Sequence, residues 1–218
     1  MDDPLDYCRL RKLVDAYANA RQTVIEAGYW PEIHWMNGIE VDRMTEPMVL
    51  REAAWVILSS GMRESVIRAK FCRFSEAFLD WHCAKSICRN ELTCRERASA
   101  VFGHQGKINA ILTFAHYLSD VGLYFFLAEL KQIGAKFLQR FPYLGPATSK
   151  HLAKNLGIAV AKPDRHLIRI AHAANVHCVD KLCAVISDSI GEAVATVDLV
   201  LWRYATLNRR YEADFAIN

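Results

Sequence analysis

The sequence contains no unbroken apolar run long enough to cross a membrane. The longest runs, such as Ala53–Leu58, have six residues, whereas a membrane-spanning helix needs about 20 predominantly apolar residues. The acidic start MDDPLDY also lacks the basic and then apolar segments that are typical of a secretory signal. We therefore expect a cytoplasmic protein that does not associate with a membrane.

Cysteines are present, but the spacing between them is not that of a disulfide or metal-binding motif. The seven cysteines are odd in number and none forms a CxxC pair, so we expect reduced thiols that are mostly structural. His82, Cys83, Cys88 and Cys94 could together hold a metal, but the gaps between them are wide for zinc or an iron–sulfur cluster. The sequence predicts no bound metal.

Sustained alternation of apolar and polar residues, the pattern of a strand, is also missing. Apolar residues instead recur every three or four positions, as at Ile108, Ile111, Ala115 and Leu118, which is the period of an α-helix. The fold class is therefore predicted to be all-α. The expected helices cover residues 5–27, 46–59, 64–80, 93–102, 107–117, 121–133, 134–140, 147–156, 165–175, 179–190 and 192–207.

Flexible linkers, internal repeats and low-complexity segments are absent, so nothing in the sequence divides the chain into independent domains. Gly and Pro predict loops at residues 28–31, 61, 103–106, 142–146 and 157–163. A chain of 218 residues with 52% hydrophobic composition can bury a substantial core. We expect a monomer with one unit over residues 1–218, built as a single domain or as two closely packed lobes.

Acidic residues are nearly missing from residues 131–172. This segment holds eight Lys or Arg and a single acid, Asp164, which leaves 19 basic against 23 acidic residues elsewhere. The net charge of +3 is by itself a weak indication of an anionic partner. Positive charge concentrated in one segment is typical of nucleic-acid binding.

The basic segment resembles a known family. Leu144–Ala147 (LGPA) is similar to the L-P-G-V-G hairpin of the helix-hairpin-helix base-excision DNA glycosylases, and Pro163–His166 (PDRH) is similar to their V-D-x-H motif. The resemblance is strongest over residues 107–171. Residues 55–67 (WVILSSGMRESVI) look like the helix, DNA-penetrating loop and next helix of that family.

The sequence departs from the family pattern in three ways, which indicates a small, divergent member. Ala147 replaces the second hairpin glycine, and His151 replaces the usual helix alanine. The spacing from the hairpin to the aspartate is also about one helical turn shorter than in the family.

The resemblance implies a two-lobed helical fold with a helix-hairpin-helix motif. The hairpin and catalytic loop would cover about residues 137–171, with the N-terminal and C-terminal helices in the second lobe. The implied activity is that of a DNA glycosylase, which flips a modified base out of double-stranded DNA and hydrolyses its N-glycosidic bond, leaving an abasic site. Asp164 would stabilise the cationic sugar or activate water. A compatible alternative is that Asp164 caps the helix that follows it.

In the hairpin, the start of the second helix would bind a backbone phosphate of the DNA. The residues expected there are Gly145, Ala147, Ser149 and Lys150. Members of the family that also cleave the strand use a lysine at the position of Ser149, so the resemblance implies a monofunctional enzyme that uses water. Lys150 would contact phosphate, with a nucleophile or a solvated charge as the alternatives.

No cofactor is expected. The iron–sulfur cluster of some relatives needs four closely spaced cysteines after the aspartate, and only Cys178 and Cys183 follow it here.

The loop at residues 60–63 follows the predicted helix 46–59. Met62 and Arg63 would enter the minor groove and fill the gap that the flipped base leaves. The alternative is an ordinary turn between helices.

A loop predicted at residues 28–38 concentrates aromatic residues. Trp30, His34 and Trp35 would stack on the extruded base. The residues that would read the edge of that base are Glu32, His34 and Asn37. Packing in the core is the alternative interpretation of these aromatics.

The sequence leaves the biological task open. The substrate could be a damaged base or a hypermodified phage base, such as glucosylated hydroxymethylcytosine, removed in host defence. Two alternatives without catalysis are a hairpin module that only binds DNA and an all-α interaction protein.

Overall fold

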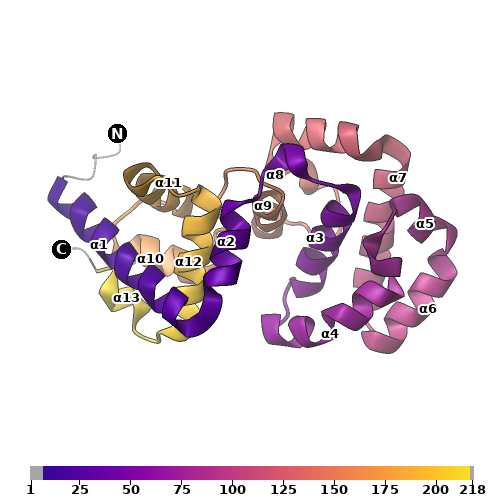
Figure 1. The fold of residues 1–218 in the computed structure, drawn as a ribbon, viewed down its shortest axis with the longest axis horizontal. Coiled ribbons are helices and arrows are strands. Elements are labelled where there is room, and N and C mark those ends of the chain that lie inside the picture. The colour runs from indigo at the N-terminus through magenta and orange to yellow at the C-terminus, as the bar shows by residue number, and fades with distance from the viewer. Residues whose placement is uncertain (1–6, 217–218) are drawn as a thin grey trace. The chain divides into compact units, whose positions relative to one another are not determined.

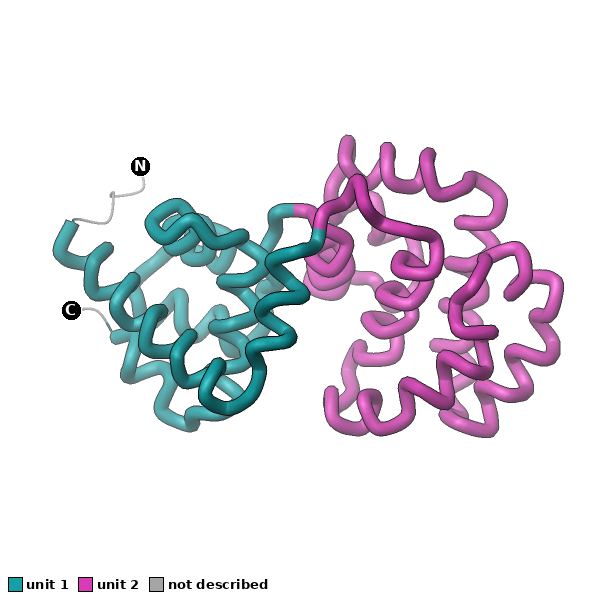
Figure 2. Tube along the Cα trace, viewed as in Figure 1, with its two compact units in different colours: residues 1–39, 159–218 teal, residues 40–158 magenta. Residues whose placement is uncertain are grey.

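The computed structural model describes residues 7–216, and the regular secondary structure in that range is entirely helical (Figure 1). The prediction of an all-α fold is therefore confirmed. The chain folds into two compact units (Figure 2). Unit 1 contains the described parts of residues 1–39 and 159–218, and unit 2 contains residues 40–158.

Unit 1 is built around the first and the last long helices of the chain. Its helices are α1 (Tyr7–Val24), α2 (Trp30–Asn37), α10 (Arg165–Ala173), α11 (Val179–Ile190), α12 (Val194–Leu207) and α13 (Tyr211–Asp214), with a π-helical turn at Ile25–Tyr29. On α1 the buried residues are Leu13, Tyr17, Ala20 and Val24, whose spacing places them on one face. That face packs against α12 and α11 in a common apolar core.

Unit 2 holds the helices from the middle of the chain. They are α3 (Glu46–Ser59), α4 (Glu64–Ala77), α5 (Ala84–Arg89), α6 (Glu91–Val101), α7 (Gln105–Ile133), α8 (Ala135–Leu138) and α9 (Pro146–Asn155), with 3₁₀ turns at Val41–Arg43 and Leu79–Trp81. Its core is rich in aromatic contacts. The rings of Phe74 and Trp81 flank Phe78, with centroids 5.2 and 5.1 Å away, and Phe114 packs on Phe126 at 5.5 Å.

Helix α7 is the single helix of the described residues that is long and apolar enough to cross a membrane. Its backbone is broken at Gly122, where φ is 76° and ψ is 157°. The hydroxyl of Tyr117, before the break, donates to Glu129, after it, at 2.7 Å. Ile108, Ile111 and other apolar residues of the first part are buried in unit 2. The first part of α7 therefore belongs to the core of unit 2, whereas Tyr124 and Phe125, after the break, are exposed.

A buried carboxyl group joins α3 to α9, the second helix of the predicted hairpin. Glu52 is 6% exposed and accepts hydrogen bonds from Asn155 Nδ2 at 2.9 Å and from Arg51 Nη1 at 2.7 Å. Burial raises the pKa of Glu52, although Arg51 and Asn155 act in the opposite direction. A specific buried contact thus fixes α9 to α3 within unit 2.

The predicted helices at 46–59 and 179–190 are confirmed with their boundaries. The prediction of a loop at residues 28–38 is wrong, because residues 30–37 form α2. Pro31 lies in the first turn of this helix, where a missing N–H costs no hydrogen bond, and Gly28, with a φ of 88°, separates α2 from α1. The short helix α5 was not predicted, because six residues hold too little periodic pattern.

Candidate functional site

The hairpin predicted at Leu144–Ala147 is a turn between α8 and α9. Leu144 is 1% exposed and fixes the turn to the core of unit 2. Gly145 is the N-cap of α9 with extended backbone (φ −73°, ψ −174°), and Pro146 occupies the first turn. In any helix the first amides have no intrahelical acceptor, so those of Ala147 and Thr148 can bind an anion.

The two polar residues that follow differ sharply in exposure. Ser149 is fully buried, and its hydroxyl donates to Pro146 O at 3.1 Å. In this structure the Ser149 hydroxyl is therefore not presented to solvent, where a phosphate would lie. Lys150 lies about 100° further round the helix and is partly exposed.

The predicted DNA-penetrating loop connects α3 to α4 in the same unit. Gly61 has a φ of 67° and turns the chain, and the amide of Met62 donates to Ser59 O at 3.0 Å. The side chain of Met62 is 38% exposed, and Arg63 is also exposed. The loop therefore presents an apolar and a cationic side chain to solvent, as a wedge would.

A buried lysine links this loop to the hairpin turn. Lys107 is 2% exposed, and its Nζ donates to Leu58 O and Ser60 O, both at 2.5 Å. The same Nζ lies 5.8 Å from the centre of the Tyr143 ring. Burial lowers the pKa of Lys107. The two segments predicted to contact DNA in unit 2 are thus joined by one side chain.

The sequence analysis did not identify Lys107, although a signal was present. Lys107 lies in the first turn of α7, where the helix dipole disfavours a cation. It also immediately precedes the apolar pattern that begins at Ile108. A lysine in such a position needs acceptors, and the carbonyl groups at the end of α3 supply them.

Asp164 is the N-cap of α10, as the alternative interpretation of the sequence predicted. Its Oδ1 accepts hydrogen bonds from the amides of His166 at 2.8 Å and Leu167 at 3.0 Å. No donor among residues 7–216 contacts Oδ2, and the side chain is partly exposed. One oxygen therefore holds the carboxylate in place while the other is open to a ligand.

A second carboxylate holds the backbone just before Asp164. Asp198, on α12, is 1% exposed, and its Oδ2 accepts from the amide of Lys162 at 2.5 Å. The carbonyl of Lys162 in turn accepts from the amide of Asp164 at 2.8 Å. The sequence analysis missed Asp198, although a lone acid inside the apolar run of residues 194–202 indicates a buried polar contact.

His166 lies beside Asp164 in unit 1. Its Nδ1 is 3.1 Å from the hydroxyl of Tyr211, and its Nε2 accepts from Arg165 Nε at 3.4 Å. Burial lowers the pKa of His166, and this effect is larger than the opposing effect of the nearby Asp164 carboxylate. His166 therefore adjoins Asp164, with its own ring nitrogens in contact with Tyr211 and Arg165.

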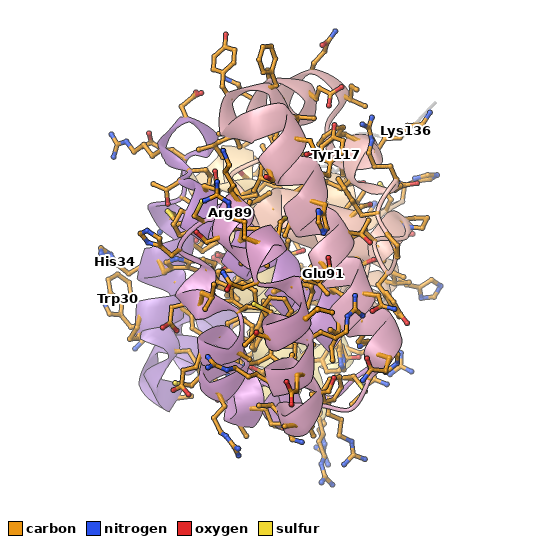
Figure 3. The ribbon with its side chains drawn as sticks, turned by 90° about the vertical axis from the view of Figure 1, so that its right-hand side faces the viewer. Trp30, His34, Arg89, Glu91, Tyr117 and Lys136 are labelled. Atoms are coloured by element: carbon orange, nitrogen blue, oxygen red, sulfur yellow. The ribbon has the colours of Figure 1, made fainter. Side chains whose placement is uncertain are left out.

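The predicted substrate-stacking residues lie on α2 in unit 1. Trp30 is 48% and Trp35 is 41% exposed, so neither lies in the core. The ring of His34 is 6.0 Å from that of Trp30, and both project outward (Figure 3). The guanidinium of Arg21 lies 5.9 Å from the centre of the Trp30 ring. These residues form an exposed aromatic surface on a helix.

Two of the three residues predicted to read a base edge have structural partners instead. Glu32 accepts from Arg203 Nη2 at 2.6 Å, and Asn37 Oδ1 accepts from Thr196 at 2.6 Å. Both contacts fix α2 to α12. His34 and Asn37 are exposed, whereas Glu32 is partly buried.

Several cations of the basic segment are paired with acids or buried. Lys131 pairs with Asp42 at 2.6 Å, and Arg169 pairs with Glu212 at 3.4 Å. Lys154 is 4% exposed. Acids from outside the segment thus neutralise part of its charge, which the local count in the sequence could not show.

The cysteines are free thiols, as predicted. Cys94 and Cys183 are buried, whereas Cys8, Cys72 and Cys178 are exposed. Within residues 7–216, no three His, Cys, Asp or Glu side chains are grouped closely enough to hold a metal ion.

The candidate residues are divided between the units. The hairpin and the Met62 loop belong to unit 2, whereas Asp164 and the aromatic residues of α2 belong to unit 1. In comparisons with known proteins, no family model, curated protein or solved structure matches the chain.

Proposed function

We propose that this protein is a monofunctional DNA glycosylase of the helix-hairpin-helix type. The observation that carries the proposal is the environment of Asp164. Two backbone amides orient its Oδ1, and no donor among the described residues contacts its Oδ2. A carboxylate placed in this way can act on a cationic group without first losing a partner.

The features of unit 2 support binding of double-stranded DNA. The amides of Ala147 and Thr148 at the start of α9 would bind one backbone phosphate, with Lys150 beside them. Met62 and Arg63 would fill the space left by the extruded nucleotide. In this proposal unit 2 is the hairpin-bearing lobe, and unit 1 is the lobe of the N-terminal and C-terminal helices.

The chemistry assigned to Asp164 is electrostatic stabilisation with activation of water. The N-glycosidic bond breaks, and the bonding electrons leave with the base, which takes up a proton. The sugar becomes an oxocarbenium-like cation, which the negative charge of Asp164 stabilises. Water then adds to C1′ and gives up a proton, with Asp164 as the general base. The products are the free base and an abasic site.

Water is the proposed nucleophile because the hairpin position that bears a lysine in the strand-cleaving members holds a serine here. Ser149 occupies the position of the nucleophilic lysine and is buried. The Nζ of Lys107 is also buried and is engaged by two carbonyl groups. The strand should therefore remain intact after the base is released.

The substrate is proposed to be a modified base in duplex DNA, either a damaged base or a hypermodified phage base. The exposed rings of Trp30, His34 and Trp35 are proposed to stack on it. We place the protein in the cytoplasm as a monomer.

The experiment is a panel of duplexes that each carry one modified base, including glucosylated hydroxymethylcytosine, with release of free base as the readout. The expected result is release from one class of duplex, with strand breakage only after alkali treatment. Borohydride should trap no covalent complex. Covalent trapping that requires Lys150 would instead identify a lyase and refute the monofunctional assignment.

A second candidate is a DNA-binding module without catalysis. It is favoured by the fact that the hairpin, the Met62 loop and Lys107 lie in one unit, whereas Asp164 does not. Binding of duplex DNA without release of any base on the panel would select it over the glycosylase.

A further inference from the structure

Three aromatic side chains adjoin the hairpin in unit 2, and the resemblance does not account for them. We call Phe102, His104 and Tyr143 the aromatic row. The rings of Phe102 and His104 stack with centroids 6.1 Å apart, and Tyr143 meets His104 edge-on at 5.8 Å. His104 is exposed, Tyr143 is 37% exposed and Phe102 is partly exposed. The row therefore reaches the surface.

Tyr143 is held in a defined position. Its backbone has a φ of 66°, a conformation that few non-glycine residues adopt. Its carbonyl accepts from Thr148 Oγ1, in the first turn of α9, at 2.8 Å. The row is thus continuous with the start of the hairpin helix.

Gly106 leaves the space that the Tyr143 hydroxyl occupies. A Cβ atom at Gly106 would overlap this hydroxyl and would lie 3.5 Å from Cζ of the ring. An alanine would therefore displace the tyrosine, whereas a phenylalanine in place of the tyrosine would remove the clash. The fit between these two residues supplies a test of the row.

Cations lie at both ends of the row. Lys70 Nζ is 5.8 Å from the centre of the Phe102 ring, and Lys107 Nζ is 5.8 Å from the centre of the Tyr143 ring. Lys70 is exposed and donates to Val101 O at 3.1 Å. Among the described residues, no carboxylate pairs with Lys70 or His104. Lys70 therefore gives this surface a positive charge that fits an anionic partner, whereas the charge of Lys107 is buried.

We infer that the aromatic row binds unpaired nucleotides of DNA. Partly exposed rings beside ammonium groups are the combination that binds single strands, because bases stack on the rings while cations attract the phosphates. Paired bases hide their faces within the duplex, so stacking requires bases that are unpaired or extruded. The inference rests on the proposed function for the identity of the partner, since a glycosylase disrupts pairing at its target.

The experiment measures the affinity of the full chain for a fluorescein-labelled single-stranded oligonucleotide and for the matching duplex. Tyr143→Leu should weaken single-strand binding about thirtyfold, the middle of the range for removal of one stacking ring, and duplex binding much less. Tyr143→Phe, the matched control, keeps the ring and should bind like wild type. Equal affinity of wild type and Tyr143→Leu for the single strand would overturn the inference, as would an equal loss for both DNA forms.

A second pair of variants decides the question if Tyr143→Leu does not fold. Gly106→Ala should weaken single-strand binding by displacing the ring, and Gly106→Ala combined with Tyr143→Phe should restore it. If Tyr143→Leu does not fold and Gly106→Ala binds the single strand like wild type, the inference is overturned. Base release is scored separately, so a chain that releases no base but shows this pattern refutes the glycosylase proposal and leaves the aromatic row supported.

Discussion

Replacement of Asp164 separates its structural role from its proposed chemical role. Asp164 caps α10 through Oδ1, which accepts two amides. Asparagine keeps an oxygen acceptor and is about as good an N-cap as aspartate, whereas alanine loses the cap at a cost of about 1 kcal/mol. For a chain of this size, such a loss lowers the melting temperature by roughly 2–4 °C.

The expected effect on catalysis is much larger and the same for both variants. A group that stabilises charge developing in the transition state contributes roughly a hundredfold to a thousandfold in rate. Asp164→Asn and Asp164→Ala both delete the negative charge, so both should lose at least this factor. Affinity for duplex DNA should be retained or increase, because a repulsion between the carboxylate and the phosphates is removed.

The assay combines single-turnover release of base from the duplex that reacts in the panel with thermal unfolding followed by circular dichroism. Asp164→Ala should have a lower melting temperature than Asp164→Asn, whereas the two variants should lose the same amount of activity. Wild-type excision by Asp164→Asn would refute the proposed mechanism. Activity that follows melting temperature instead of charge would reduce Asp164 to a helix cap.

Three further variants test other parts of the molecule. Lys150→Ala should weaken binding to all duplexes about equally and reduce the slope of log affinity against log salt by about 1, whereas the exposed Lys85→Ala should not; an unchanged slope would remove Lys150 from the interface. Met62→Ala should slow base extrusion, followed by 2-aminopurine fluorescence, more than it weakens binding, because a wedge acts after docking; equal effects on both would contradict a wedge. Burial raises the pKa of Glu52 above its ordinary value of 4.5, so its contribution to stability is full below that value and is lost as pH rises through the folded-state pKa. Glu52→Gln should therefore lose less stability than wild type as pH rises above 4.5. Thermal unfolding at a series of pH values measures this, and a stability difference that does not change with pH would show that Glu52 does not titrate in that range.

The sequence alone was sufficient for the features that depend on neighbours along the chain. The three- and four-residue spacing of apolar positions predicted the all-α fold and the boundaries of α3 and α11, because amphipathic periodicity is a local property. The capping role of Asp164 was predictable for the same reason, since the two amides that donate to its side chain lie two and three residues further along the chain.

Only the tertiary structure decided which side chains are exposed and what they contact. Ser149 was expected at the surface and is buried, whereas Trp30 and Trp35 lie on the outside of a helix where a loop was expected. Lys107 contacts carbonyl groups 47 and 49 residues away, and Asp198 accepts from an amide 36 residues away. Local periodicity does not predict such partners, because packing between helices that are distant in sequence determines which polar groups are buried together.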